Sequence, residues 1–505
     1  MMANVRAIPR LACLKQCRSF ASGAETPLMW KLTHGMFDPE TPMTEKFPGI
    51  PDPIDTEAPK AGAVEITTLS NGVRIASQDM GNPVTAVALF VGAGSRNENP
   101  FSSGVSHLIE RLAFKGSSTR SKYRMTRDME RTGGLFASSA ARETIAFSAE
   151  GMREKLPEML SILSDTALSP VTTGCVEGSA GWDAAVEEIN AQTAVIKDEL
   201  KNFSSEPSGR VTEAIHAAAF HGNTLGLPLV AEERKLGLMT PSTVNDFVSD
   251  NFTPGKIVVS AANVDHEALV EVAQSSLGEL SGECMPPSTA RYTGGSVKIS
   301  SDGPGQVAIG FKGVSWQDDD LVPVCVLHTL LGGGGSFSSG GPGKGMYTRL
   351  YSEILNKHGW VSAASAFNHC YSDGGLFGIH AVCEDPAYLN NLIEVVGLQV
   401  GKLAGPLASG ELERAKMMTK SSLLMNLESR AVVCEDIGRQ ILCSGKYAGP
   451  EELIKKIEAV SEGDIRKVAS KMLESQPSVV TFGEEYATYE YSAIESSIKR
   501  QAQLA

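Results

Sequence analysis

The chain has 505 residues, a formal net charge of −14 at pH 7, 42% hydrophobic residues, 21% charged residues and nine scattered cysteines. This length exceeds what one hydrophobic core supports, so two or more domains are expected, and no apolar run approaches the roughly eighteen residues of a membrane-spanning helix. The acidic charge argues against a nucleic-acid partner and favours basic peptides, and cysteines without a Cys-x-x-Cys pair indicate reduced thiols rather than a disulfide framework.

Residues 1–22 differ from the rest of the chain in their charge. Three arginines and one lysine alternate there with apolar residues, and no acidic residue precedes Glu25. This amphipathic, acid-free pattern predicts a mitochondrial transit peptide cleaved after Phe20, with a disordered basic tail as the alternative. Its removal would change the formal net charge from −14 to −18. Residues 23–60 are rich in proline and weakly periodic, which predicts an extended arm.

From residue 61 onward, alternating and helical patterns follow one another. Asn71-Gly72 separates two short alternating runs, which is the signal of a hairpin turn. Apolar spacing then distinguishes further strands from helices. The expected elements, in chain order, are strands at 64–69, 73–76 and 86–91, a helix at 104–114, a strand at 144–149 and a helix at 155–168.

The second half of the chain repeats this order. Ala88 matches Ala308 and Ser95 matches Ser315 at the same offset of 220 residues. A repeat of this length predicts a duplicated domain rather than a short solenoid unit. The repeated elements are a strand at 307–311, a helix at 321–331, a strand at 376–381 and a helix at 388–403.

These patterns predict an α/β (α+β) fold with two sandwich domains. Each domain is expected to hold a mostly antiparallel sheet covered by helices. The boundaries that we predict are 61–282 for the first domain, 283–296 for a linker containing Pro286-Pro287, and 297–505 for the second domain.

A glycine-rich segment in the second domain is the first candidate site. Eight glycines lie within residues 332–345, and such a run serves as a flexible linker or as a loop that approaches a ligand closely. The apolar segments at both ends favour the loop. A phosphate-binding P-loop does not fit, because Lys344 is followed by Gly345 instead of Ser or Thr. An extended peptide fits better, since glycine-rich backbone leaves N–H and C=O groups free. The candidate substrate-binding residues are Gly332, Gly333, Gly334, Gly335, Ser336, Phe337, Ser338, Ser339, Gly340, Gly341, Pro342, Gly343, Lys344 and Gly345.

The helix expected at 104–114 carries a degenerate metallopeptidase motif. His107, Glu110 and Arg111 share one helix face, and His-x-x-Glu-His at this spacing is the inverted zinc-peptidase motif. Arg111 stands where the second histidine is required, and a guanidinium has no lone pair to give a metal. Glu199 on a later helix is a candidate third ligand. One imidazole and one carboxylate are fewer than the three ligands of a catalytic zinc site, so we expect no catalytic residue and no metal in this chain. The alternative is a chance match on an amphipathic helix.

With the predicted transit peptide and the duplicated domain, this motif and the glycine-rich loop resemble the α subunits of mitochondrial processing peptidases. These subunits belong to the pitrilysin-type, M16-like metallopeptidase family. The resemblance runs from about residue 48 to about residue 490, and a stretch near 172–185 departs from the pattern. Its most specific segments are residues 107–114, 332–351, 425–430, 435–440 and 468–473.

The resemblance implies a division of labour in the mitochondrial matrix. A catalytic β subunit would carry zinc and cleave, whereas this chain would hold no cofactor and would bind the basic presequences of imported precursors. The glycine-rich loop would guide the extended peptide. Carboxylates would be needed for the arginines of the presequence, and Glu428, Glu435 and Asp436 are the candidates.

Two alternatives stay open. Members of the same family serve as core proteins of respiratory complex III, where this chain would contact other complex III subunits on the matrix face of the inner membrane, and in some lineages one chain does both. The other alternative is a self-sufficient metallopeptidase, against which Arg111 argues.

Overall fold

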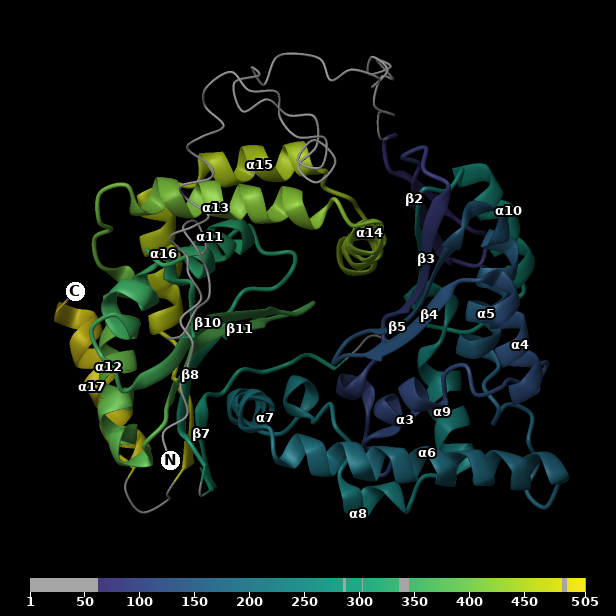
Figure 1. The fold of residues 1–505 in the computed structure, drawn as a ribbon, viewed down its shortest axis with the longest axis horizontal. Helices are drawn as coiled ribbons and strands as arrows, with labels where there is room; N and C mark the ends of the chain where they lie inside the picture. The colour runs from purple at the N-terminus through teal and green to yellow at the C-terminus, as the bar shows by residue number, and fades with distance from the viewer. Residues whose placement is uncertain (1–61, 285–287, 302, 336–344, 484–487, 505) are drawn as a thin grey trace, which may run out of the picture. The chain divides into compact units, whose positions relative to one another are not determined.

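The computed structural model describes residues 62–504, apart from 285–287, 302, 336–344 and 484–487 (Figure 1). The predicted transit peptide at 1–22 and the extended arm at 23–60 lie outside these residues, as does the Pro286-Pro287 pair of the predicted linker.

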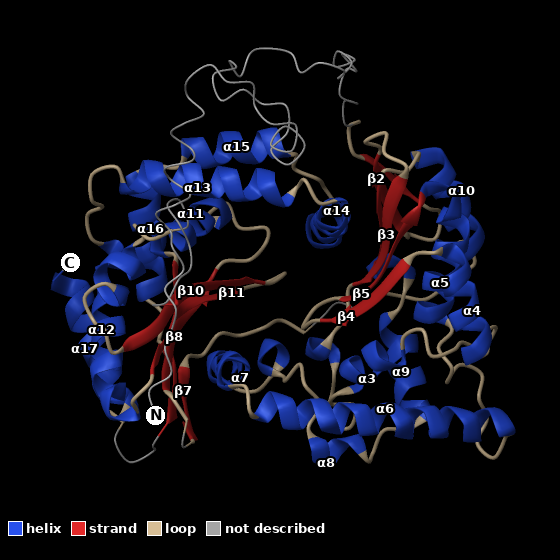
Figure 2. Ribbon diagram, viewed as in Figure 1, coloured by secondary structure: helices blue, strands red, loops and turns tan. Residues whose placement is uncertain are grey.

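Six strands form the first sheet, in the order β1-β2-β6-β3-β5-β4. Its strands β2, β3, β4 and β5 are labelled in Figure 2. Neighbouring strands are antiparallel, except that β2 and β6 run parallel. The hairpin predicted around Asn71-Gly72 is present, with Thr68 paired to Arg74. The strands are β1 (Glu65–Thr68), β2 (Arg74–Gln78), β3 (Val84–Val91), β4 (Leu135–Ala140), β5 (Ile145–Met152) and β6 (Ile257–Ala262).

The helices of the first half, apart from α7, lie on one side of this sheet and cover one of its faces. On β3, Val87 and Leu89 point to these helices, whereas Ala88 and Phe90 point to the opposite face, as strand geometry requires. The helices are α3 (Val105–Leu112), α4 (Lys122–Thr132), α5 (Leu156–Leu168), α6 (Ala180–Ser204), α7 (Pro207–Phe220), α8 (Glu233–Leu236), α9 (Pro241–Asn251) and α10 (His266–Leu277).

Six strands also form the second sheet, in the order β7-β12-β8-β11-β10-β9. Its neighbouring strands are antiparallel except β7 and β12, so the parallel pair lies at the edge of this sheet, whereas in the first sheet it lies one strand in from the edge. The strands are β7 (Gly295–Ser300), β8 (Gly305–Gly313), β9 (Gly333–Gly335), β10 (Val361–Cys370), β11 (Gly375–Cys383) and β12 (Ser478–Gly483).

The helices of the second half pack mainly on one face of this second sheet, through residues such as Leu327 and Val396. The predicted helix at 321–331 is present with the same bounds. The helices are α11 (Leu321–Leu331), α12 (Leu389–Gly401), α13 (Glu411–Asn426), α14 (Arg430–Ser444), α15 (Pro450–Ala459), α16 (Glu462–Leu473) and α17 (Tyr491–Leu504).

Two helices cross between the halves and cover the remaining faces of the sheets. Helix α14 of the second half packs on β3 and β6 of the first sheet, where Gly438 lies so close to Phe90 that a Cβ would come within 2.3 Å of the ring (Figure 1). Helix α7 of the first half packs on β8 and β12 of the second sheet through Ile215 and Phe220. The exchange buries both faces of each sheet, because the helices supplied by each half cover only one.

An ion-pair cluster adds a polar connection between the halves. The guanidinium group of Arg96, whose side chain is 2% exposed, donates to Glu143 in the first half and to Asp373 in the second. A buried arginine needs such partners to offset its loss of hydration. Because these partners come from both halves, the cluster links the first half to the second.

The predicted mixed fold with two mostly antiparallel sheets and covering helices is therefore confirmed. None of the helices in the described part of the chain is long and apolar enough to cross a bilayer.

Candidate functional site

The degenerate motif lies on α3, which the chain enters through Gly104. This glycine has φ of +94°, and a Cβ there would lie 2.4 Å from the Cβ of Ala231. Only glycine fits both the left-handed backbone and the close approach. Helix α3 packs against α6, so its His107 and Arg111 meet Glu199 of α6.

His107 is held as a neutral imidazole. Its side chain is 10% exposed, and burial lowers its pKa. The backbone N–H of Ala231 donates to Nδ1 at 3.4 Å, which leaves the ring proton on Nε2. Nε2 lies 3.3 Å from Oε2 of Glu199. A histidine that binds zinc usually donates a hydrogen bond from its other ring nitrogen, and the Nδ1 of His107 instead accepts one.

Arg111 supplies the positive charge of this site. Its Nε lies 3.0 Å from Oε2 of Glu199, and its NH2 group lies 3.5 Å from Oε1 of Glu110. The guanidinium therefore stands between two carboxylates, one from its own helix and one from α6. The structure thus brings together all four residues that the sequence singled out, His107, Glu110, Arg111 and Glu199.

Glu110, which holds the position of the water-activating glutamate, is bound to the neighbouring strand. Its Oε2 accepts the backbone N–H of Ala140 at 2.9 Å, and its own carbonyl accepts a hydrogen bond from the Ser138 hydroxyl at 3.0 Å. Both partners belong to β4, the last strand of the first sheet. This arrangement anchors α3 to an edge strand and occupies one of the carboxylate oxygens.

These residues do not fit a catalytic zinc ion. Such a site needs three protein ligands and an open position, and a single imidazole and Glu199 face a guanidinium that stays protonated. Within the described part of the chain, no group of three or more His, Cys, Asp or Glu side chains is arranged to hold a metal.

The glycine-rich segment begins as an edge strand. Gly333–Gly335 form β9, which pairs antiparallel with Ala363–Ser365 of β10 and is the last strand of the second sheet. Gly332 and Gly333 have φ of +55° and +109°, and a Cβ on Gly333 would lie 2.0 Å from the carbonyl oxygen of Ala364. At least these two glycines are therefore required by the fold itself. The candidates Ser336, Phe337, Ser338, Ser339, Gly340, Gly341, Pro342, Gly343 and Lys344 lie outside the described residues.

The three candidate carboxylates differ in their surroundings. Glu428 and Glu435 are exposed, and neither makes an ion pair within the described residues. Asp436 accepts hydrogen bonds from Arg439 at 2.6 Å and from Gln440 at 2.8 Å, so it is already engaged on its own helix.

Two duplicated α/β halves with a degenerate His-x-x-Glu motif on the first define a class of peptidase-like proteins. A family model described as Insulinase (Peptidase family M16) matches residues 74–233, and a second, described as Peptidase M16 inactive domain, matches residues 239–419. The chain belongs to peptidase family M16.

Among its relatives are α subunits of the mitochondrial-processing peptidase, which confirms the resemblance found in the sequence. The chain is 34% identical over 493 residues to that of Bos taurus, covering 92% of this chain and 91% of the relative. It is 34% identical over 456 residues to the probable α-1 subunit of Arabidopsis thaliana, covering 89% and 87%. A chain of Complex III2 from Candida albicans, Inz-5 bound, shares the fold, with a TM-score of 0.73, 20% identity, and coverage of 86% of this chain and 100% of that chain.

Sequence reasoning missed the backbone groups that shape this site. Ala231 and Ala140 carry no side-chain chemistry, so nothing in their sequence context indicated that their N–H groups would bind His107 and Glu110. The edge strand β4 was also missed, although the alternation in its exposure is that of a strand with one covered face.

Proposed function

We propose that this chain is the non-catalytic, substrate-binding subunit of a mitochondrial processing peptidase, and that a zinc-bearing β subunit cleaves the presequences it holds. The observation that carries the proposal is the guanidinium of Arg111, which takes Glu199 as its counter-ion at 3.0 Å. A catalytic zinc site needs three protein ligands, and in this chain a guanidinium stands where one of them is required. The names of its relatives support the assignment to this enzyme.

The proposed binding mode uses the edges of the two sheets. Strands β4 and β9 stand last in their sheets, so on one side of each the backbone pairs with no other strand among the described residues. An extended peptide binds such an edge by adding a strand. Residues 336–344 of the glycine-rich loop follow β9 directly in the sequence, so the loop begins at the edge strand of the second sheet.

Electrostatic attraction would bring the peptide to the chain. The formal net charge of −14 draws in a basic presequence, and exposed carboxylates then pair with its arginines. Glu428 and Glu435 are the better candidates for this pairing, because neither makes an ion pair within the described residues. Asp436 would first have to give up Arg439.

The first experiment is cleavage of a presequence peptide by this chain alone, by a partner that retains His-x-x-Glu-His, and by their mixture, with zinc measured per chain. We expect cleavage in the mixture and zinc on the partner. Turnover and stoichiometric zinc in the isolated chain would disprove the non-catalytic role.

A second experiment separates peptide binding from subunit assembly. Deletion of residues 336–344 keeps β9 paired to β10 and should lower the affinity for a presequence peptide. Size-exclusion chromatography of the mixture should still show the complex with the partner. Unchanged peptide affinity in the deletion variant would remove the loop from the proposed site.

A second role, as a core subunit of complex III at the matrix face of the inner membrane, is supported by the shared fold with a Complex III2 chain. Fractionation of mitochondria tests it. Recovery of the chain in the membrane fraction together with other complex III subunits supports this role, and recovery only in the matrix fraction excludes it.

A further inference from the structure

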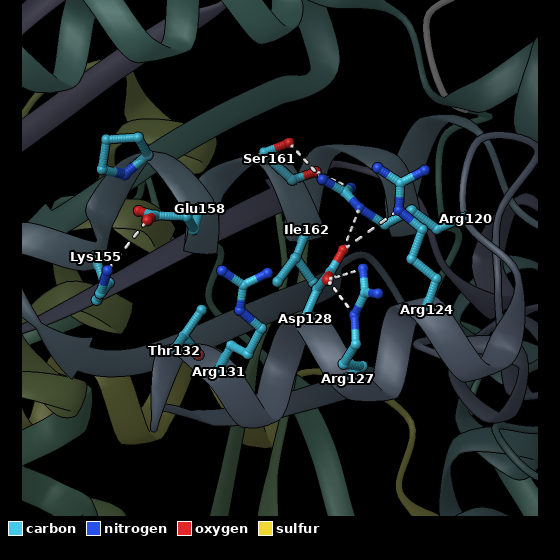
Figure 3. A pocket seen from close by; sticks show the side chains of 11 residues that line it. Arg120, Arg124, Arg127, Asp128, Arg131, Thr132, Lys155, Glu158, Ser161 and Ile162 are labelled. Carbon is cyan, nitrogen blue, oxygen red and sulfur yellow. Dashed lines mark hydrogen bonds and ion pairs between the residues drawn. The ribbon is translucent and has the colours of Figure 1, made fainter.

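A cleft of about 430 Å³ lies between α4 and the start of α5, away from the degenerate motif (Figure 3). Its lining includes Arg120, Arg124, Arg127, Arg131 and Lys155. The volume is that of a small-molecule site rather than of a single ion. Such a concentration of positive charge contrasts with a chain whose formal net charge is −14, and the proposed peptide-binding function does not use it.

The cations are arranged by the secondary structure. Arg124, Arg127 and Arg131 follow the i, i+3, i+7 spacing of α4, so their side chains leave the same face of the helix. Arg120 precedes the helix and is fixed from α5, where the Ser161 hydroxyl accepts its NH2 group at 3.0 Å and Asp165 accepts its NH1 group. One wall of the cleft therefore holds an arginine that is fixed by hydrogen bonds, and the other carries three exposed guanidinium groups.

The carboxylates in the cleft are too few for these cations. Asp128 lies 3.0 Å from Arg127, 3.5 Å from Arg120 and 3.7 Å from Arg124, so three guanidinium groups share this carboxylate, and of these only Arg120 has a second carboxylate partner, Asp165, among the described residues (Figure 3). The hydrogen bond from Arg127 lowers the pKa of Asp128, which is therefore already ionised at neutral pH. Arg131 makes no ion pair with any residue that the structure describes.

Glu158, the other carboxylate of the lining, is paired with Lys155 at 3.3 Å. The arginines that line the cleft carry like charges and repel each other. An anion entering the cleft would reduce that repulsion. Guanidinium groups bind phosphate oxygens in pairs, with a geometry that a lysine cannot match.

We propose that this cleft binds a small anion carrying two or more phosphate groups, either as a free metabolite or as the headgroup of a lipid. More than one phosphate is needed because Arg131 and the groups around Asp128 are separate points of positive charge along α4. The lining holds no aromatic side chain on which a base could stack, so recognition rests on the phosphates.

The test uses the full chain and two probes. Sodium tripolyphosphate is titrated calorimetrically as the free phosphate, and vesicles of phosphatidylcholine, with or without cardiolipin, are tested by co-sedimentation. We expect one saturable site whose affinity falls as salt is added. Binding of tripolyphosphate supports a free ligand, and binding only to the cardiolipin vesicles supports a lipid headgroup.

Three variants locate the binding. Arg127→Ala with Arg131→Ala should weaken binding about tenfold or more, because two charge-assisted contacts are lost. Arg234→Ala with Arg500→Ala removes two exposed arginines elsewhere and should leave the affinity unchanged. Asp128→Asn should strengthen binding, since it removes the carboxylate that competes with the ligand.

Three results would overturn the proposal. They are no binding of either probe, an equal loss in the control pair and the cleft pair, and preference for poly-glutamate over tripolyphosphate. The second would mean that the arginines act only through overall charge, and the third would indicate an acidic polypeptide. Thermal unfolding of each variant confirms that the exposed substitutions leave the fold intact.

Discussion

Arg111 gives one face of α3 a fixed positive charge where the zinc-peptidase motif has a second histidine. The side chain leaves α3 one turn after His107 and meets Glu199, the residue that a metal would share with that histidine. A guanidinium carries its charge at every accessible pH, so the carboxylate gains a permanent counter-ion and needs no metal to offset it. The residues of this site therefore form an ion-paired cluster and do not offer the three ligands of a catalytic zinc ion.

The substitution Arg111→His should not restore tight zinc binding. The Nδ1 of His107 accepts the N–H of Ala231, and Oε2 of Glu110 accepts the N–H of Ala140, so both groups remain in hydrogen bonds that do not suit a catalytic site. Zinc measured per chain after dialysis should stay well below one, and a presequence peptide should not be cleaved. Arg234→His, on an exposed helix, is the matched control for an added histidine. Stoichiometric zinc with turnover would contradict this reading of the site.

At the scale of the elements, β9 shows why the fold itself requires some glycines of the glycine-rich segment. The strand is only three residues long, and it pairs with β10 at the outer edge of the second sheet. Gly333 adopts φ of +109° directly beside the carbonyl of Ala364. The first glycines of the run are therefore required by the strand pairing of the fold. The proposal of a ligand-binding role rests on the residues that follow them, 336–344.

The substitution Gly333→Ala should destabilise β9. The left-handed backbone and the 2.0 Å approach to Ala364 together should lower the free energy of unfolding by about 1–3 kcal/mol. Gly335→Ala is the matched control, because the nearest atom to its Cβ would be 3.9 Å away. Thermal unfolding gives the stability, and hydrogen exchange of residues 361–370 reports the strand pairing. Equal stability of the two variants would mean that β9 contributes little to the sheet.

At the scale of the whole molecule, histidines lie in the contact between the two halves. His216 of α7 bonds through Nε2 to the hydroxyl of Tyr371 at 2.8 Å, and its ring centroid lies 5.0 Å from that of His369 on β10. Burial lowers the pKa of His369, and likewise that of His380 on β11, to about 4. For His369 the positive charge of Arg142 contributes to this lowering, so these rings stay neutral in the folded chain at neutral pH.

This burial predicts a loss of stability on acidification. The unfolded chain takes up protons on these histidines below about pH 6.5, whereas His369 in the folded chain resists protonation until about pH 4. Stability should therefore be full above pH 6.5 and should fall between pH 6.5 and 4, by up to about 1.4 kcal/mol per pH unit for each such histidine.

Urea unfolding at a series of pH values measures this slope. His369→Gln should give a shallower slope than the parent chain, because one titrating group is removed from the unfolded state. His221→Asn is the control, since His221 is exposed and its φ of +53° suits asparagine. Parallel slopes for the parent and His369→Gln would show that this histidine does not set the acid limit.

The sequence alone determined the features that depend on neighbouring residues. The hairpin at Asn71-Gly72, the helix at 321–331, the repeated order of elements and the face shared by His107, Glu110 and Arg111 all follow from local spacing, which a linear pattern records. The family resemblance rests on the same short segments.

Only the tertiary structure decided how the halves complete one another. The exchange of α7 and α14, the pairing of β9 and the backbone donors from Ala231 and Ala140 join residues far apart in the chain. Such contacts form because every apolar face and polar group must find a partner when the whole core packs, and no local pattern says which distant partner that is.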